Sequence, residues 1–164
     1  MLSNQIKSIT KLSIVAALYV ALTYAFSFMS FGEIQFRIAE ILMLLCFFNK
    51  KYTISLTLGC LIANLFSPYG IVDIVFGTLA TFVACVGIML FNKKHLFLAS
   101  LMVPIGNIIV GIEIAIINSF TLVPALLTIL WIFIGEFVVV SIIGVPLFKL
   151  LLKNEKFEEL VLDI

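Results

Sequence analysis

The chain has 164 residues, of which 63% are hydrophobic and 12% charged, and its net charge is +1. Soluble domains contain about 45–50% apolar and about 25% charged residues, and a domain of this length could not hide so much apolar surface from water. The composition therefore argues against a soluble domain, a disordered chain and a fibrous protein. It indicates one integral-membrane domain over residues 1–164.

Six apolar runs follow one another along the chain, each closed by a polar or turn-forming stretch. They cover residues 12–29, 36–48, 54–66, 71–91, 96–117 and 122–152. A helical crossing needs about 20 apolar residues, and backbone groups in lipid find their partners within a helix. We therefore expect an all-α protein with six transmembrane helices. The second and third runs are short, so a re-entrant hairpin made of these two runs is the alternative to two full crossings.

The lysines predict the orientation of these spans. With six spans and the N-terminus in the cytoplasm, all nine lysines fall on the cytoplasmic side, where basic residues gather. They are Lys7, Lys11, Lys50, Lys51, Lys93, Lys94, Lys149, Lys153 and Lys156. We expect both termini to be cytoplasmic, and the model with a re-entrant hairpin keeps the same sides. A cleaved signal peptide is a further interpretation of the first run, but that run is long for the apolar part of such a peptide.

Six charged residues lie in or at the ends of the apolar runs, mostly in the half of the membrane opposite the lysines. They are Glu33, Arg37, Glu40, Asp73, Glu113 and Glu136. A charge at this depth costs at least a few kcal/mol and therefore faces a cavity or a partner. Asn64 and Asn107 add neutral polar groups at similar depth. We expect a polar pocket open to the outside, and its candidate substrate-binding residues are Arg37, Glu40, Asn64, Asp73, Asn107, Glu113 and Glu136.

Several of these residues also have a purely structural interpretation. Glu33, Arg37 and Glu40 would share one face of an α-helix and could neutralise one another. Asp73 follows a Pro-Tyr-Gly turn and could cap the next helix. Glu113 and Glu136 have no lysine or arginine nearby in sequence, so each would be protonated or would wait for the donors of a ligand.

Small residues recur every four positions in the first span, at Ala17, Ala21 and Ala25. Such a stripe lets another helix pack closely. The same spacing occurs elsewhere, at Gly59 and Ala63 and at Ala80 and Ala84. The stripe alone is therefore weak evidence for a partner.

The motifs of the familiar membrane enzymes are missing from the sequence. There is no GxxxxGK[ST] loop for nucleotides and no HExxH zinc motif, and His95 is the single histidine. The three cysteines, Cys46, Cys60 and Cys85, form no CxxC pair and indicate buried thiols. We therefore expect no catalytic residue, no metal site and no cofactor. The remaining role is solute binding and transport, driven by ions or by ATP hydrolysis on another subunit.

Three segments carry a resemblance to a known family. Residues 32–40 (GEIQFRIAE), 59–67 (GCLIANLFS) and 70–81 (GIVDIVFGTLAT) are similar to the corresponding parts of the QueT family. The likeness extends from about Ala16 to Pro146 and is less specific in the last two spans. Members of this family are queuosine-precursor transporters, and they are S components of energy-coupling factor (ECF) uptake systems.

The resemblance implies a six-helix S component in the cell membrane of a prokaryote, with no nucleic acid among its partners. Such a subunit would capture a 7-deazaguanine-type base outside and work with a T subunit and two cytoplasmic ATPases. Its Ala17, Ala21 and Ala25 would pack on the T subunit. The ring N–H and amine of such a base can both bond to one carboxylate. We therefore hypothesise that Glu113 or Glu136 binds this edge.

In the same hypothesis, Asn64 and Asn107 satisfy other ring atoms, and the charges around Arg37 shape the mouth of the pocket. Three alternatives stay open. The same architecture could take another vitamin-like solute, because a fold does not fix a ligand. The chain could instead be an ion-coupled carrier, for which inverted repeats are expected. It could also be a structural subunit whose buried charges pair with the helices of a partner.

Overall fold

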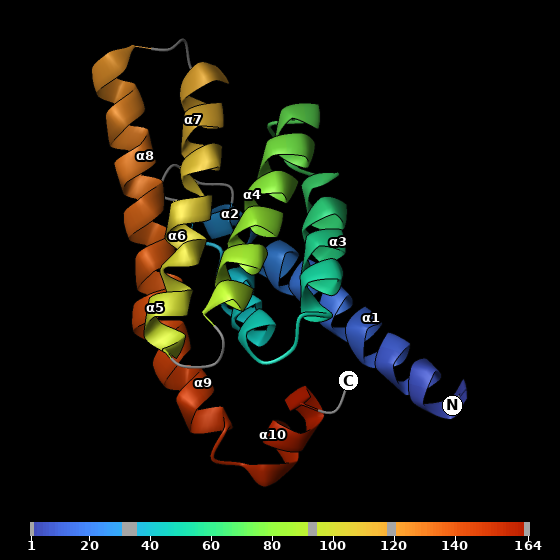
Figure 1. The fold of residues 1–164 in the computed structure, drawn as a ribbon. Helices are drawn as coiled ribbons and strands as arrows, with labels where there is room; N and C mark the ends of the chain where they lie inside the picture. The colour runs from blue at the N-terminus through green and yellow to red at the C-terminus, as the bar shows by residue number, and fades with distance from the viewer. Residues whose placement is uncertain (1, 31–35, 92–94, 118–120, 163–164) are drawn as a thin grey trace.

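The computed structural model describes residues 2–30, 36–91, 95–117 and 121–162, and these residues form a bundle of helices with no strand among them (Figure 1). The first half contains α1 (Leu2–Ala25), α2 (Ser27–Ser30), the 3₁₀-helix η1 (Ile38–Phe47), α3 (Tyr52–Asn64) and α4 (Ile71–Leu90). The second half contains α5 (Leu96–Ser100), α6 (Met102–Gly106), α7 (Ile108–Ile117), α8 (Leu122–Glu136), the π-helical segment η2 (Phe137–Gly144), α9 (Val145–Leu151) and α10 (Glu155–Leu162). The predicted all-α class is confirmed.

Four of the six predicted spans are helical segments long and apolar enough to cross a membrane. They are Gln5–Ala25, Ile71–Leu90, Leu96–Ile117 and Leu122–Leu151. The other two runs form η1 and α3, which are shorter. At about 2.0 Å per residue in a 3₁₀-helix and about 1.5 Å in an α-helix, each of these extends about 20 Å, against a hydrocarbon core of about 30 Å. Six full crossings therefore remain a prediction.

Prolines interrupt the two longest apolar runs. Pro104 has no N–H for the carbonyl of Ser100, and the run 96–117 breaks at Leu101 and again at Asn107 into α5, α6 and α7. Pro146 stands in the first turn of α9, directly after the wider turns of η2. A π-helical segment is rare and is often found at functional sites. Here it begins immediately after Glu136.

The segments that carry lysines gather at one end of the bundle. The start of α1, the turn between η1 and α3 and the end of α9 all lie at the lower end in Figure 1. Lys51 Nζ donates to Ser8 Oγ at 3.4 Å, and Lys11 Nζ donates to the carbonyl of Leu160 at 3.5 Å. The upper end contains the start of α4 and the paired ends of α7 and α8. This separation fits the predicted orientation, which remains a prediction.

The helix η1 runs through the middle of the bundle. It contacts α1, α3, α4, α5, α9 and η2, and eight of its ten residues are buried. Its first turn follows Arg37, which is 2% exposed. The second apolar run is short because this helix starts inside the protein and not at its surface. As a consequence, the charged residues at its start lie in the interior.

Candidate functional site

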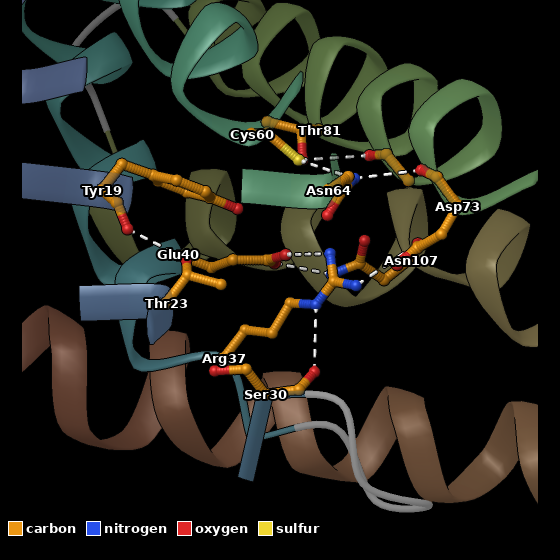
Figure 2. A network of polar contacts seen from close by, with 11 residues as sticks. Tyr19, Thr23, Ser30, Arg37, Glu40, Cys60, Asn64, Asp73, Thr81 and Asn107 are labelled. Atoms are coloured by element: carbon orange, nitrogen blue, oxygen red, sulfur yellow. Dashed lines mark hydrogen bonds and ion pairs between the residues drawn. The ribbon is translucent and has the colours of Figure 1, made fainter. Parts of the chain in front are cut away.

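Arg37 joins three elements of the bundle (Figure 2). Its Nη2 donates to Asp73 Oδ1 on α4 at 3.5 Å, and its Nη1 lies 3.8 Å from Glu40 Oε1 on η1. Its Nε donates to the backbone carbonyl of Ser30, at the end of α2, at 3.3 Å. All three charged side chains are buried. A buried carboxylate is tolerated when it is paired and hydrogen-bonded, so Arg37 holds Glu40 and Asp73 in place.

Arg37 and Glu40 pair with each other, which agrees with the expectation that these charges could neutralise one another. We expected them on an α-helix, and the helix that follows Arg37 is instead the 3₁₀-helix η1. In a 3₁₀-helix residues three apart are aligned along the axis, which brings Glu40 beneath Arg37 at the i+3 position. Glu33 lies outside the described residues.

Asp73 does not cap α4. The residue before the helix is Gly70, with φ of +66°, and no side chain caps the end. Asp73 lies in the first turn, where the helix dipole favours a negative charge. Its side chain faces inward to Arg37, and its carbonyl accepts a bond from Asn64 Nδ2 at 3.0 Å. Its role is therefore an interior ion pair.

Both predicted asparagines contribute amide donors to this network. Asn107, at the joint between α6 and α7, donates through Nδ2 to Glu40 Oε2 at 2.6 Å. Asn64, the last residue of α3, donates to Asp73 and also to Cys60 Sγ at 3.4 Å. Five of the seven predicted binding residues, namely Arg37, Glu40, Asn64, Asp73 and Asn107, are thus brought together by direct contacts.

Four further residues support the network, and the sequence analysis did not single them out for it. Ser30 supplies a carbonyl to Arg37, and Thr81 Oγ1 donates to Cys60 Sγ at 3.1 Å. Gly77 leaves room on α4 for the side chains of Asn64 and Asp73, because a Cβ at Gly77 would lie 2.6 Å from both Asn64 Nδ2 and Asp73 Oδ1. A sequence signal existed for Gly77 alone, since it stands one helical turn after Asp73. Cys60 is a buried thiol, as predicted, and it also accepts these bonds.

Glu113 on α7 and Glu136 at the end of α8 differ from the other acids. They are 3% and 0% exposed, and no donor of a described residue reaches any of their four carboxylate oxygens at hydrogen-bonding distance. Glu136 lies close enough to Glu40 and Arg37 for their charges to act on it. Glu113 lies close enough to Asp73 and Arg37 for their charges to act on it. A buried polar group without a partner is costly, so these two carboxyls are the open positions of the site.

Three hollows that are lined by described residues lie away from this network. One of about 510 Å³ lies at the His95 end of α5, and one of about 650 Å³ lies beside the acidic residues of α10. The third, about 710 Å³, is an apolar groove between α1 and α3. The pocket among the acids therefore remains a prediction. The structure shows the polar residues expected to line it and the contacts between them.

The stripe of Ala17, Ala21 and Ala25 is exposed on the outside of the bundle. Ala17 and Ala21 line the groove between α1 and α3. The other two stripes are used inside the chain. Gly59 packs against the backbone of Ala16, and a Cβ on Gly106 would lie 2.8 Å from Ala84 Cβ. The first stripe thus presents a smooth surface that no described part of this chain covers.

A multi-pass helical membrane protein with a charged, partly unpaired centre and no metal-binding cluster in the part described has the features of a solute transporter. The chain belongs to the QueT transporter family, whose sequence profile matches residues 9–153. Members of this family are transporters, so the expectation that the chain is not an enzyme is confirmed.

One curated relative is described as the queuosine precursor transporter QueT of Lactococcus lactis subsp. cremoris (strain MG1363). It is 47% identical over 88 residues. The match covers 52% of this chain and 52% of the relative, about half the length of each. No solved structure matches this chain.

Proposed function

We propose that this protein is the substrate-binding S component of an ECF importer, and that it captures a 7-deazaguanine-type queuosine precursor from outside the cell. The observation that carries the proposal is the pair of buried carboxylates, Glu113 and Glu136, whose four oxygens have no donor among the described residues. The solute of the relative from Lactococcus lactis, a queuosine precursor, supports the class of ligand.

The chemistry of such a base suits these open positions. Its guanine-like edge presents a ring N–H and an exocyclic amine side by side, and one carboxylate accepts both bonds. Bonds to an ionised acceptor are shorter and stronger than neutral ones. A site that is built to pair with such donors also rejects analogues that lack them, because its own polar groups are then left unpaired.

The seven predicted residues then divide into two roles. Arg37, Glu40 and Asp73, with the two asparagines, already have partners within the chain and form a rigid wall. Glu113 and Glu136 have no hydrogen-bond partner in the described part of the chain, and they contact the solute. A wall fixed before the ligand arrives lowers the cost of binding, since few groups must be ordered.

In an ECF importer, the stripe on α1 would pack on the T subunit. Ala17 and Ala21 let a partner helix approach α1 closely, because close packing in lipid depends on small side chains. The groove continues onto α3 at Leu58 and Ile62. Two cytoplasmic ATPases bound to the T subunit supply the energy for uptake.

Direct titration of the purified protein with a panel of deazaguanines and vitamins tests the ligand. We expect a deazaguanine to bind, and Glu113→Gln and Glu136→Gln each to weaken that binding by about tenfold or more, as for a lost bond to a charged group. Glu155→Gln, on exposed α10, is the matched control and leaves affinity unchanged. Unchanged affinity in both buried variants contradicts the site, and binding of a vitamin instead contradicts the ligand.

Uptake of a labelled base by cells with and without the T subunit and the ATPases tests the coupling. We expect uptake to require all of these subunits. Uptake by this chain alone, in vesicles without ATPase subunits, would identify an ion-coupled carrier instead.

A further inference from the structure

We propose that the hollow at the start of α5 binds a negatively charged phospholipid, from the leaflet that faces the lysine-rich end of the bundle. In this site the phosphate contacts His95 and Lys149, and the first carbons of an acyl chain lie on the aromatic wall between η1 and α9. This is a second binding site, and it does not depend on which solute the protein carries.

Three helix ends form the hollow, which has a volume of about 510 Å³. The end of η1 contributes Phe47, the start of α5 contributes Phe97, and Leu152 follows the end of α9. These three elements contact one another in the bundle. The hollow is therefore a fixed feature of the fold and not a gap between independent segments.

The inner wall of the hollow is aromatic and is held in place by its neighbours. The Phe47 and Phe48 rings meet edge to face with centroids 5.3 Å apart, and the Phe48 ring stacks on Phe148 at 6.3 Å. Phe148 is buried and meets Phe157 of α10 edge to face. At the outer rim, by contrast, Phe97 is 45% exposed. An apolar chain that enters from the lipid side thus meets a preformed surface, which lowers the cost of binding.

The hollow lies at the boundary of two membrane-spanning segments. One of these segments begins at Leu96 and another ends at Leu151. Leu98 lines the hollow from within these limits, and His95 and Leu152 line it from just beyond them. A ligand that fills such a place must be polar at one end and apolar at the other. A phospholipid meets this condition, whereas a free phosphate ion has no apolar surface to bury against the phenylalanines.

The polar groups at this boundary are basic. Among the described residues that line the hollow are His95 and Lys149, and none of them is acidic. Both side chains are exposed, and Lys149 stands in the last turn of α9. An ammonium and a ring N–H donate hydrogen bonds to phosphate oxygens, and basic pockets between membrane helices bind the headgroups of anionic lipids. The charge therefore selects an anionic headgroup over a zwitterionic one.

This site is separate from the groove between α1 and α3. No residue lines both, so a lipid at the start of α5 leaves the face of α1 open to a partner helix. The lipid instead holds the ends of η1, α5 and α9 together at the membrane surface. We therefore expect it to stabilise the isolated chain.

Two lipids with identical acyl chains isolate the contribution of the headgroup. The purified full-length chain in detergent is titrated with dioleoylphosphatidylglycerol and with dioleoylphosphatidylcholine. Native mass spectrometry measures the retained lipid, and thermal unfolding measures Tm. We expect phosphatidylglycerol to bind at least about fivefold more tightly and to raise Tm more, since each basic group near the surface adds about a factor of five. Equal binding and equal shifts in Tm for the two lipids would overturn the proposal.

Variants and a soluble anion locate the site. Lys149→Gln should weaken binding of phosphatidylglycerol about fivefold and leave phosphatidylcholine unchanged. Lys156→Gln is the matched control, because it removes the same charge from exposed α10, outside the hollow, and it should change neither. Phe97→Ala should weaken both lipids, because it removes part of the apolar rim.

Two results would contradict the assignment. Identical binding of phosphatidylglycerol by the Lys149→Gln and Lys156→Gln variants would show that the lipid binds elsewhere. Displacement of the lipid by inorganic phosphate or by a polyglutamate peptide at equal concentration would identify an anion or peptide site instead.

Discussion

The buried centre around Arg37 and the face of α1 each show the same contrast. In both regions, residues of one kind are fully packed or paired at some positions and lack such contacts at others. Ala80 and Ala84 pack on Gly106, and Gly59 packs on Ala16, whereas Ala17, Ala21 and Ala25 are exposed. In the centre, Glu40 and Asp73 are paired with Arg37, whereas Glu113 and Glu136 have no partner among the residues that the structure describes. In both regions we propose that the incomplete contacts mark where something else binds, a solute inside and a helix outside.

Removal of Arg37 should cause the largest loss of stability, because Glu40 and Asp73 then become unpaired acids. Arg37→Met leaves Glu40 and Asp73 buried without a counter-charge. Breaking a buried pair in this way costs about 3–5 kcal/mol. Thermal unfolding in detergent measures the loss, with Lys51→Met, on an exposed turn, as the control. Equal melting temperatures for the two variants would show that Arg37 does not hold the centre together.

Gly77 tests how closely the wall of the site is packed. In Gly77→Ala the new methyl group would lie 2.6 Å from Asn64 Nδ2 and Asp73 Oδ1. Overpacking of this kind costs about 1–3 kcal/mol, and we expect weaker solute binding because Asp73 is displaced. Gly87→Ala, on the same helix, is the comparison, since its Cβ would lie 3.0 Å from Met102 Cβ and Cγ and is therefore less crowded. Identical melting temperatures and affinities for the two variants would contradict a tightly packed wall.

The smallest effect on the isolated chain is expected on α1. Ala21→Leu changes an exposed position, so the free energy of unfolding should stay within about 0.5 kcal/mol of the original. Co-purification with the T subunit and coupled uptake should nevertheless be lost, because the bulkier side chain fills the groove. Ile14→Phe, exposed on α1 outside the groove, is the control. Normal uptake by Ala21→Leu would contradict the assignment of this face.

The positions of the helices could be predicted closely from the sequence. The run 71–91 forms α4 (Ile71–Leu90), and the run 54–66 forms α3 (Tyr52–Asn64). These ends are set by local chemistry, such as the turn that contains Pro68 and Gly70. The grouping of the buried polar residues could also be predicted, because charged side chains in an apolar bundle are stable only when they contact other charged or polar groups.

The partners of these residues could not be predicted in the same way. Asp73 pairs with Arg37 across 36 positions, and Glu40 pairs with Asn107 across 67. Spacing along one helix says nothing about contacts between distant segments. The 3₁₀ form of η1 is likewise set by its surroundings, since its residues have no local signal against an α-helix. For the same reason the division between paired and unpaired acids required the folded structure.

The central position of η1 has a consequence for how the protein responds to its membrane. Its six neighbouring elements shield it, whereas α1 is exposed along most of its length. A change in bilayer thickness acts on helices that touch lipid, mainly through their tilt. A thinner bilayer should therefore tilt α1 and alter the angle at which a partner helix meets it, while the charges at the start of η1 keep their geometry.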